Sequence, residues 1–401
     1  MKGMASGYFV LWLTLFFVII ELITFFGILY LFENKRSKIK FSIVFHFIAV
    51  LVFIIWFLSY GQIELIKHTK NYDFFYFSST LLTVNYLPKT LFSLFVIIAL
   101  FLRIFKFKCK IPVLIYSGLI LSTGCFLSII SGVFIGRQNV ITEEITISIP
   151  SLPVDLEGLK IVQISDAHLA SLKNNDLIAK CVRKVDEINP DLFFFTGDIV
   201  NNYYQEIQGF DEQFSSFKAK YGKFAILGNH DYGNYVDWLS REMKLQNNDK
   251  IMEMLTEAGF YLLRNDADKI QIGNTAFYVI GTEDWGHGTY NNYSELDKAI
   301  KNIDNDLFRI LLAHNPKQWP IQVVPDTDIQ LTLSGHTHGG QAGFKIAGIR
   351  FSLMRLIEKN WGGLYEKDGQ YLYVNRGLGC IGNLMRIDME PEITVITLTR
   401  R

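Results

Sequence analysis

Long apolar runs occupy the first third of the chain. Residues 7–32 are apolar except for Glu21, and residues 41–60 are apolar apart from His46. Residues 112–136 are apolar throughout. Each run can cross about 30 Å of hydrocarbon as an α-helix, which takes about 20 residues. The pattern predicts membrane-spanning helices, and the first run is too long, with too many spans behind it, to be a signal peptide.

The stretch from residue 74 to residue 105 is less regular, because Pro88 and Lys89 interrupt it. Either a span starts near Leu81 and kinks at the proline, or the early part lies in the membrane interface. We count one span, residues 81–105. Four spans are therefore predicted, and residues 1–136 form a transmembrane helical bundle.

Basic residues between the spans indicate their orientation. One cluster follows the first span and another follows the third: Lys35, Arg36, Lys38 and Lys40, then Arg103, Lys106, Lys108 and Lys110. Four spans put both clusters on one side, which we expect to be the cytoplasm. The prediction is a multi-pass protein of the plasma (inner) membrane with everything after Gly136 extracytoplasmic. Without the third span, this side would be reversed.

Two ionisable side chains, Glu21 and His46, lie inside the predicted spans. Such groups either contact a substrate or an ion path, or they join helices by hydrogen bonds. We favour the second interpretation.

After residue 136 the pattern changes to short apolar runs that alternate with amphipathic stretches. Residues 137–158 are interpreted as a linker and a first strand, and residues 159–401 as a folded domain. Five apolar runs each end in metal-capable side chains: "KIVQISD" at Asp166, "DLFFFTGD" at Asp198, "KFAILGNHD" at Asn229 and His230, "FRILLAHNP" at His314, and "DIQLTLSGHTHGG" at His336 and His338. Strands that alternate with helices form layered α/β sheets, which bind ligands at the carboxyl ends of their strands. We therefore expect the five loops to meet.

The side chains at these loops suit a metal site. The candidates are Asp166, His168, Asp198, Asn229, His230, His314, His336 and His338, and they include five of the eight histidines in the chain. Imidazole and carboxylate together suit divalent Mn, Fe or Zn. An Asp can bridge two ions about 3.5–4 Å apart, which is the arrangement that clamps a phosphoryl group.

The composition gives no indication of a nucleic-acid-binding protein, a zinc knuckle or a disulfide-stabilised fold. The 39 basic and 39 acidic residues cancel, so no overall field points to nucleic acid. The hydrophobic fraction of 50% is an average over residues 1–136, which are rich in Phe, Leu, Ile and Val, and a less apolar remainder. Four cysteines without a CxxC pair indicate neither a zinc knuckle nor a disulfide framework.

The ordered set "DAH", "GD", "GNHD", "H" and "GHTH" resembles the calcineurin-like metallophosphoesterase superfamily. The longer "GHTHGGQ", the late "NRGLG" and the multi-span N-terminus are similar to its membrane-anchored branch of the YkuE type. The resemblance runs from about Lys160 to the C-terminus. It implies an α/β fold in which a four-layer αββα sandwich follows the helices, with a dinuclear metal centre.

The resemblance also implies roles for the candidate residues. Asp166, His168, Asp198 and His338 match the ligands of a first metal ion, and Asp198, Asn229, His314 and His336 match those of a second. His230 matches a histidine that binds no metal but contacts the phosphate and helps to protonate the leaving group. Asp231 stands where many members have Glu, and either carboxylate could orient His230.

Other residues near these motifs have two interpretations each. Arg376 could bind a phosphate or form a salt bridge. Asp284, Trp285 and His287 could line the site or belong to a loop at its rim. Asn202, with Asn201 before it, could line the site or form a turn.

We expect a membrane-anchored phosphoesterase that hydrolyses phosphate mono- or diesters by attack of a metal-bound hydroxide. Its expected partners are the lipid bilayer and a phosphate-containing substrate of the envelope or linked to a lipid. One alternative is a UDP-diacylglucosamine-type pyrophosphatase of lipid A synthesis, which the predicted topology disfavours because such substrates are usually cytoplasmic. The other is a non-catalytic membrane sensor or transporter, which is disfavoured because no ligand position is missing.

Overall fold

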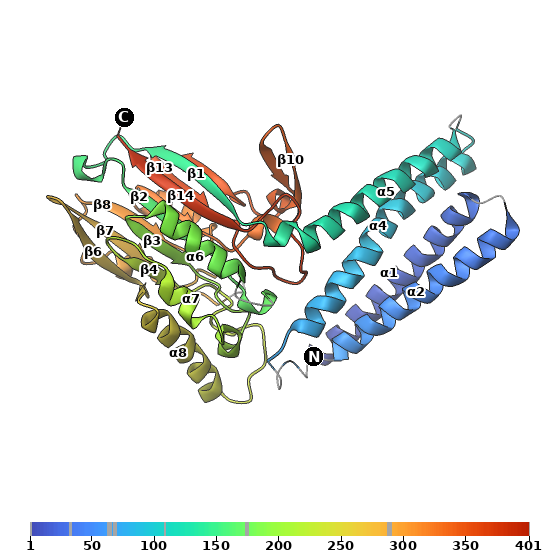
Figure 1. Cartoon of the computed structure of the whole chain (residues 1–401), viewed down its shortest axis with the longest axis horizontal. Helices are drawn as coiled ribbons and strands as arrows, with labels where there is room; N and C mark the ends of the chain where they lie inside the picture. Colours follow the sequence, from blue (N-terminus) through green and yellow to red (C-terminus); the bar gives the residue numbers. More distant parts are fainter. Residues whose placement is uncertain are drawn as a thin grey trace. The chain divides into compact units, whose positions relative to one another are not determined.

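The computed structural model describes residues 2–31, 34–61, 66, 70–107, 110–172, 176–286 and 291–400. The chain divides into two compact units, which Figure 1 shows in sequence colours. The first comprises residues 1–66 and 73–133, and the second comprises residues 67–72 and 134–401. The short segment before residue 73 therefore packs with the second unit, although it lies between two helices of the first.

The first unit consists of long apolar helices: α1 (Lys2–Leu31), α2 (Lys35–Gly61), α4 (Asp73–Ile104) and α5 (Ile111–Phe134). All four are long and apolar enough to cross a membrane. Helix α4 starts at Asp73, earlier than the expected start near Leu81, and continues through Pro88. Neighbouring helices can satisfy the backbone groups that a proline frees, so a proline does not end a membrane helix.

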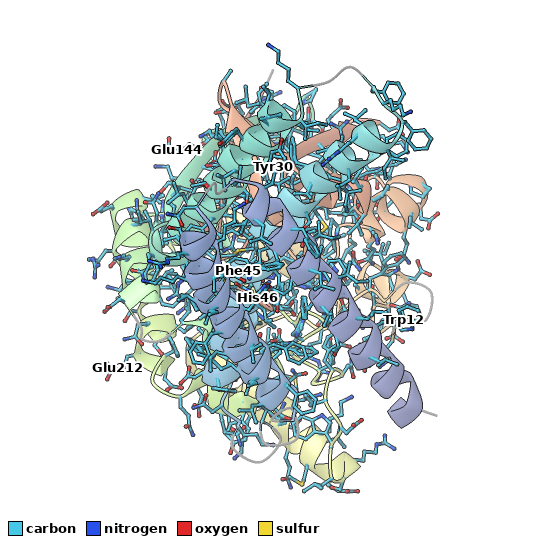
Figure 2. All side chains as sticks on the ribbon, turned by 90° about the vertical axis from the view of Figure 1, so that its right-hand side faces the viewer. Trp12, Tyr30, Phe45, His46, Glu144 and Glu212 are labelled. Carbon is cyan, nitrogen blue, oxygen red and sulfur yellow. The ribbon has the colours of Figure 1, made fainter. Side chains whose placement is uncertain are left out.

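A polar contact joins three of these helices. Lys89 Nζ on α4 donates a hydrogen bond to Glu21 Oε1 on α1 at 2.7 Å. His46 Nδ1 on α2 lies 3.8 Å from Glu21 Oε2. Figure 2 labels His46 and its neighbour Phe45. The lysine that interrupts the apolar pattern is thus paired with the acidic residue of the first span. This contact favours a role for Glu21 in helix association.

The second unit contains two six-stranded mixed sheets. The first has the order β1-β14-β2-β3-β4-β5, and the second has the order β12-β13-β9-β8-β7-β6. The strands of the first sheet are β1 (Ile141–Ser148), β14 (Glu392–Thr399), β2 (Lys160–Ile164), β3 (Leu192–Thr196), β4 (Lys223–Ile226) and β5 (Tyr261–Leu262). Those of the second are β12 (Gly363–Lys367), β13 (Gln370–Val374), β9 (Leu331–Ser334), β8 (Phe308–Leu312), β7 (Thr275–Gly281) and β6 (Asp266–Ile272). A separate hairpin is formed by β10 (Gly343–Ile346) and β11 (Ile349–Ser352).

The side chains of β3 show how the layers are built. Phe193 and Phe195 point outward into a cluster with the helices α6 (Asp176–Ile188), α7 (Asp211–Ser216) and α8 (Arg241–Glu257). Phe194 points the other way, into the cluster between the two sheets. The outer face of the second sheet packs against α9 (Leu296–Ala299), α10 (Val324–Asp326) and the turn Trp319–Val323. The order helices, sheet, sheet, helices confirms the predicted four-layer sandwich.

Parallel pairing brings the ends of the predicted strands to one edge. In the first sheet, β2 pairs with β3 and β3 with β4, all parallel. In the second sheet, β8 and β9 are parallel neighbours. The two sheets are joined at this edge by Gln163, whose Nε2 donates to Thr196 Oγ1 and to Ser334 O, each at 2.9 Å. The five loops that carry the candidate ligands therefore leave the sheets together.

Phe194→Ala is expected to lower the free energy of unfolding of the second unit by about 3–5 kcal/mol, because it leaves a cavity between two sheets. The thermal midpoint should fall by roughly 6 °C or more, at about 2–4 °C per kcal/mol. A thiol-reactive dye can follow unfolding in detergent through the buried Cys181. Phe344→Ala is the control, since Phe344 is 51% exposed. Equal shifts in the two variants would contradict the assignment of Phe194 to the core.

Candidate metal centre

Five loops from the two sheets supply the candidate ligands. Asp166 and His168 follow β2, Asp198 follows β3, and Asn229 follows β4. From the second sheet, His314 follows β8, and His336 and His338 follow β9. The structure brings the side chains at all seven predicted ligand positions close together.

The backbone at these positions is unusual. Five of the candidate ligands have positive φ angles: Asp166 (50°), His168 (38°), Asp198 (59°), His336 (74°) and His338 (52°). Left-handed backbone is uncommon for residues other than glycine, and it concentrates at functional sites where the surrounding structure enforces it. Five of the seven ligand candidates are therefore held in conformations that cost free energy, and each conformation aims a side chain at the common centre.

Glycine is needed where the loops approach each other most closely. A Cβ at Gly335 would overlap the Asp166 carboxylate and the Ser165 hydroxyl. A Cβ at Gly197 would lie 2.9 Å from His314 Nδ1. The glycine that precedes His336 therefore serves a close approach between the two sheets.

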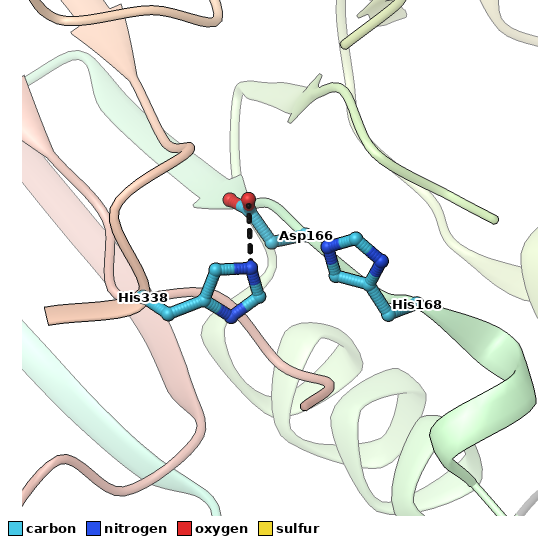
Figure 3. Close-up of side chains that lie close together, drawn as sticks. All are labelled: Asp166, His168 and His338. Atoms are coloured by element: carbon cyan, nitrogen blue, oxygen red, sulfur yellow. Dashed lines mark ion pairs between the residues drawn. The ribbon is translucent and has the colours of Figure 1, made fainter. Parts of the chain in front are cut away.

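Asp166, His168 and His338 form one group of side chains (Figure 3). His338 Nε2 lies 3.3 Å from Asp166 Oδ1. The rings of His168 and His338 have centroids 4.9 Å apart. His168 is fully buried, and its Nε2 atom has no hydrogen-bond partner among the described residues. A buried nitrogen without a partner is what a missing ligand or ion would leave.

Asp198, His314 and His336 form a second group. His314 Nε2 lies 3.2 Å from Asp198 Oδ2 and 3.1 Å from Asn229 Oδ1. His336 Nδ1 lies 2.8 Å from the same oxygen of Asn229. Ligands at about 2.0–2.2 Å from an ion stand about 3 Å apart when they are neighbours in an octahedron. The spacing of these atoms is that of neighbouring metal ligands.

The Asp198 carboxylate connects the two groups. Its Oδ2 atom lies 3.6 Å from His168 Nε2 and 3.2 Å from His314 Nε2. Its Oδ1 atom accepts a hydrogen bond from the backbone N–H of His230 at 2.8 Å. Asp198 is therefore placed between one imidazole from each group.

The buried carboxylates of the centre stabilise positive charge on groups next to them. Burial opposes the charged form of His314, yet the adjacent Asp198 carboxylate raises the pKa of His314 to about 10. His314 Nδ1 lies 2.7 Å from Thr196 O, so Nδ1 donates and Nε2 faces two oxygen atoms. In a neutral ring this Nε2 carries no proton and would repel both oxygens. A divalent ion held by these residues would supply the charge that the proton otherwise provides.

Two other histidines of the centre are neutral at neutral pH. Burial lowers the pKa of His168 to about 3, with a further contribution from His230. Burial also lowers the pKa of His336 to about 3, with a further contribution from His314. Neutral imidazoles are metal ligands, whereas imidazolium is not. Together with the orphaned His168 Nε2 and the ligand spacing, these pKa values show that the residues fit divalent ions.

Neighbouring groups orient several ligands. His168 Nδ1 lies 2.8 Å from Asn201 Oδ1, so the ring donates there and turns Nε2 toward Asp198. Outer hydrogen bonds of this kind set the tautomer and direction of a metal-binding histidine. At His338, Nδ1 instead faces the guanidinium of Arg386 at 3.2 Å. Arg386 is fully buried and also donates to the carbonyl groups of Gly379, Arg376 and Met389.

His230 lies beside the centre and is partly exposed. Its Nδ1 atom is 2.8 Å from the carbonyl oxygen of Asn201, so the ring donates there. The ring stacks on Tyr235 with centroids 4.4 Å apart. The Tyr235 hydroxyl accepts a hydrogen bond from Asn229 Nδ2 at 2.7 Å. One tyrosine thus touches both a candidate ligand and the candidate acid.

Asp231 could orient His230 by its place in the sequence, but its described hydrogen bonds go to backbone groups. The Asp231 carboxylate instead accepts hydrogen bonds from the backbone N–H groups of Gly228, Asp198, Ile199 and Val200, at 2.9–3.2 Å. Because these donors belong to two loops, Asp231 ties the loop after β3 to the loop after β4. It therefore supports the backbone of Asp198 and has no hydrogen bond to the His230 ring among the described contacts.

The remaining candidates are found in other settings. Arg376 is buried, and its Nη2 contacts Glu392 Oε2 at 2.7 Å and Glu143 Oε1 at 2.9 Å. A salt bridge is one of the two interpretations of Arg376, and the one observed is buried. Asn202 Nδ2 donates to the Tyr72 hydroxyl at 3.0 Å, which places Tyr72 beside the loop after β3.

Asp284 is buried, and burial together with Asp198 raises the pKa of its carboxyl group to about 6, against the effect of His314. His287 lies outside the described residues.

Comparison with known proteins agrees with this geometry. The sequence model of the calcineurin-like phosphoesterase family matches residues 159–340. The metallophosphoesterase YkuE of Bacillus subtilis is 33% identical to the chain over 272 residues, which are 64% of this chain and 85% of that protein. The chain belongs to the metallophosphoesterase family. As a metallophosphoesterase it is a hydrolase of phosphoric esters, and the resemblance to the YkuE-like branch is confirmed.

Two further relatives span the same part of this metallophosphoesterase. A metallophosphoesterase of Aquifex aeolicus is 31% identical over 260 residues, which cover 64% of this chain and 90% of that protein. A "Transmembrane protein with metallophosphoesterase domain" of Danio rerio is 29% identical over 275 residues, covering 64% of this chain and 56% of that protein.

Tyr235→Phe is expected to weaken metal binding by about tenfold or more, because the Asn229 amide loses the acceptor that turns its oxygen toward the centre. The phenyl ring can still stack on His230. Titration of the metal-free protein with Mn²⁺ measures the change. Tyr261→Phe is the matched control, since Tyr261 is 58% exposed and lies outside the centre. Equal affinity in the two variants would show that Tyr235 does not position Asn229.

Proposed function

We propose that this metallophosphoesterase uses two divalent ions to hydrolyse a phosphate mono- or diester of the envelope or of a lipid. Asp166, His168, Asp198 and His338 would hold one ion, and Asp198, Asn229, His314 and His336 the other. The position of Asp198 carries this proposal, because its Oδ2 atom lies 3.6 Å and 3.2 Å from imidazole nitrogens of the two groups. Mn, Fe and Zn all suit this mixture of imidazole, carboxylate and amide oxygen.

Bound ions would supply Lewis acids that polarise the phosphoryl oxygens and activate water at neutral pH. The chain supplies the orientation. Hydrogen bonds from Nδ1 of His168 to Asn201 Oδ1 and from Nδ1 of His314 to Thr196 O hold both rings in the tautomer that presents Nε2. The Asp231 carboxylate holds the backbone of Asp198 in its left-handed conformation.

His230 is the proposed proton donor to the leaving group. Its Nδ1 hydrogen is used by the Asn201 carbonyl, so Nε2 is the atom that would hold and deliver a proton. Stacking on Tyr235 restricts the ring, and partial exposure lets a substrate reach it. A positioned acid of this kind contributes about 10²–10⁴-fold to the rate.

We place the catalytic unit outside the cytoplasm of a plasma (inner) membrane. One basic cluster lies in the first turns of α2, and the other runs from the last turn of α4 to the start of α5, which supports a cytoplasmic position for these helix ends. The hydrogen bond between Tyr72 and Asn202 supports an even number of crossings between residue 72 and the catalytic unit. An extracytoplasmic site favours an envelope ester over the UDP-diacylglucosamine-type substrate.

Asp198→Ala is expected to abolish both metal binding and hydrolysis, because it removes the carboxylate shared by the two groups. His230→Ala should retain the metal and lose about 10²–10⁴-fold in kcat. Full-length protein reconstituted with Mn²⁺ or Zn²⁺ would be assayed with bis-p-nitrophenyl phosphate, its monoester and phosphate-bearing lipids, and metal content would be measured in parallel.

The control for both variants is His46→Ala, which replaces a histidine of α2 and should change neither readout. Unchanged turnover in purified Asp198→Ala would overturn the proposed function. Loss of metal from His230→Ala would assign that histidine to the ligands.

A further inference from the structure

The hairpin β10–β11 has one apolar face. Phe344 pairs with Phe351, and Ile346 pairs with Ile349, so the four side chains lie on the same side of the two-stranded ribbon. The two phenylalanine rings stack with centroids 5.3 Å apart. Lys345 and Arg350 pair on the opposite side. The ribbon is hydrogen-bonded to neither large sheet.

The apolar face is exposed, and the turn after it extends the exposed surface. Phe344, Ile346 and Ile349 are 51%, 60% and 63% exposed. In the turn Leu353–Leu356 and the residue after it, exposure is higher still: Leu353 76%, Leu356 84% and Ile357 74%. Contiguous apolar patches on a folded domain mark interaction sites. This apolar patch, residues 344–357, therefore requires a partner.

The opposite face of the ribbon is fastened to the catalytic unit. Arg350 Nη1 donates to Glu143 Oε1 on β1 at 2.6 Å, and Arg350 Nε donates to Asp388 O at 3.1 Å. The backbone N–H of Lys345 donates to Asp388 Oδ2 at 3.0 Å. The Arg350 side chain on the polar face is thus bonded to the unit, whereas the apolar side chains on the other face are exposed.

The charges around the apolar patch identify the partner. Lys345, Arg355 and Lys359 are exposed around it. The one acidic residue between 343 and 359, Glu358, is buried and lies 3.6 Å from Lys317. Exposed apolar side chains accompanied by exposed cations and by no exposed acidic residue are the pattern of a surface that enters the interface of an anionic membrane. The same chain carries four helices that can span a bilayer, so a bilayer is available as the partner.

We propose that the apolar patch of the β10–β11 hairpin inserts into the lipid interface of the membrane in which the chain is anchored. The patch is also joined to the metal-binding loop. Ser352 Oγ donates to Gly339 O at 2.6 Å, and Thr337 Oγ1 donates to Trp361 O at 2.6 Å. Ser352 within the patch and Trp361 just after it are therefore bonded to residues next to His338 and His336. Resting on the proposed function, this arrangement points to a phosphate ester carried on a lipid head group as the substrate.

Depth-dependent quenching in nanodiscs tests the insertion directly. Full-length protein with Ala347→Cys carries a bimane label at the hairpin turn, in discs of equal parts phosphatidylcholine and phosphatidylglycerol. Asn274→Cys, at the turn of the β6–β7 hairpin, is the matched control. Labelled wild-type protein gives the background from native cysteines. Lipids brominated near the head group should quench the label at 347 at least twofold and leave the label at 274 unchanged.

Equal, weak quenching at both positions would overturn the proposal. Protection of position 347 from aqueous iodide without quenching by lipid would also overturn it, and would indicate a protein partner such as a second copy. Quenching requires no turnover, so this result stands even if the proposed function fails.

A second measurement connects insertion to catalysis. Ile346→Glu with Ile349→Glu should lower the ratio of turnover on a lipid-borne phosphate ester to turnover on bis-p-nitrophenyl phosphate by roughly tenfold. Ile346→Leu with Ile349→Leu keeps the apolar face and should keep the ratio. An unchanged ratio in the glutamate variant would contradict the role of the patch in substrate access.

Discussion

The shared position of Asp198 is the constraint on which the catalytic unit depends. Its carboxylate comes from the first sheet, and it lies within 3.6 Å of imidazole nitrogens from both sheets. To reach both imidazoles, Asp198 adopts a left-handed backbone conformation and follows a glycine. The Asp231 carboxylate holds this loop by accepting hydrogen bonds from its N–H groups. The sandwich supplies the rigidity, because the strands that end at these loops are buried on both faces.

The same constraint explains the electrostatics of the centre. Asp166 and Asp198 are buried among histidines whose pKa values diverge, with His168 and His336 lowered and His314 raised. Burying carboxylates costs free energy unless a positive charge compensates them. A proton on His314 compensates in part, and divalent ions compensate more completely. The strained backbone and the buried acids are therefore best understood as features of a site built around cations.

Much of this architecture could be predicted from the sequence. Five apolar strands end in metal-capable residues, so the sandwich and the meeting of the candidate ligands could be expected from the pattern and from the family resemblance. The roles of the supporting residues could not be predicted in the same way. Asp231 stands next to His230 in sequence, yet its carboxylate serves backbone groups of the neighbouring loop.

Arg386 and Tyr235 were missed because their contacts join positions far apart or around a turn, and no spacing rule marks them. The start of α4 at Asp73 could not be predicted, because Pro88 and Lys89 interrupt the apolar pattern, and the partner of Lys89, Glu21, lies on another helix. The apolar hairpin was also missed, since four-residue strands leave only a short alternating pattern.

The central claim is that Asp198 is shared by two ions, and Mn²⁺ titration followed by electron paramagnetic resonance tests it most directly. We predict that the full-length protein binds two Mn²⁺ ions per chain and that the spectrum shows exchange coupling between them, because one carboxylate joins both. A single bound ion, or two ions with the uncoupled six-line spectrum of isolated Mn²⁺, would contradict the claim.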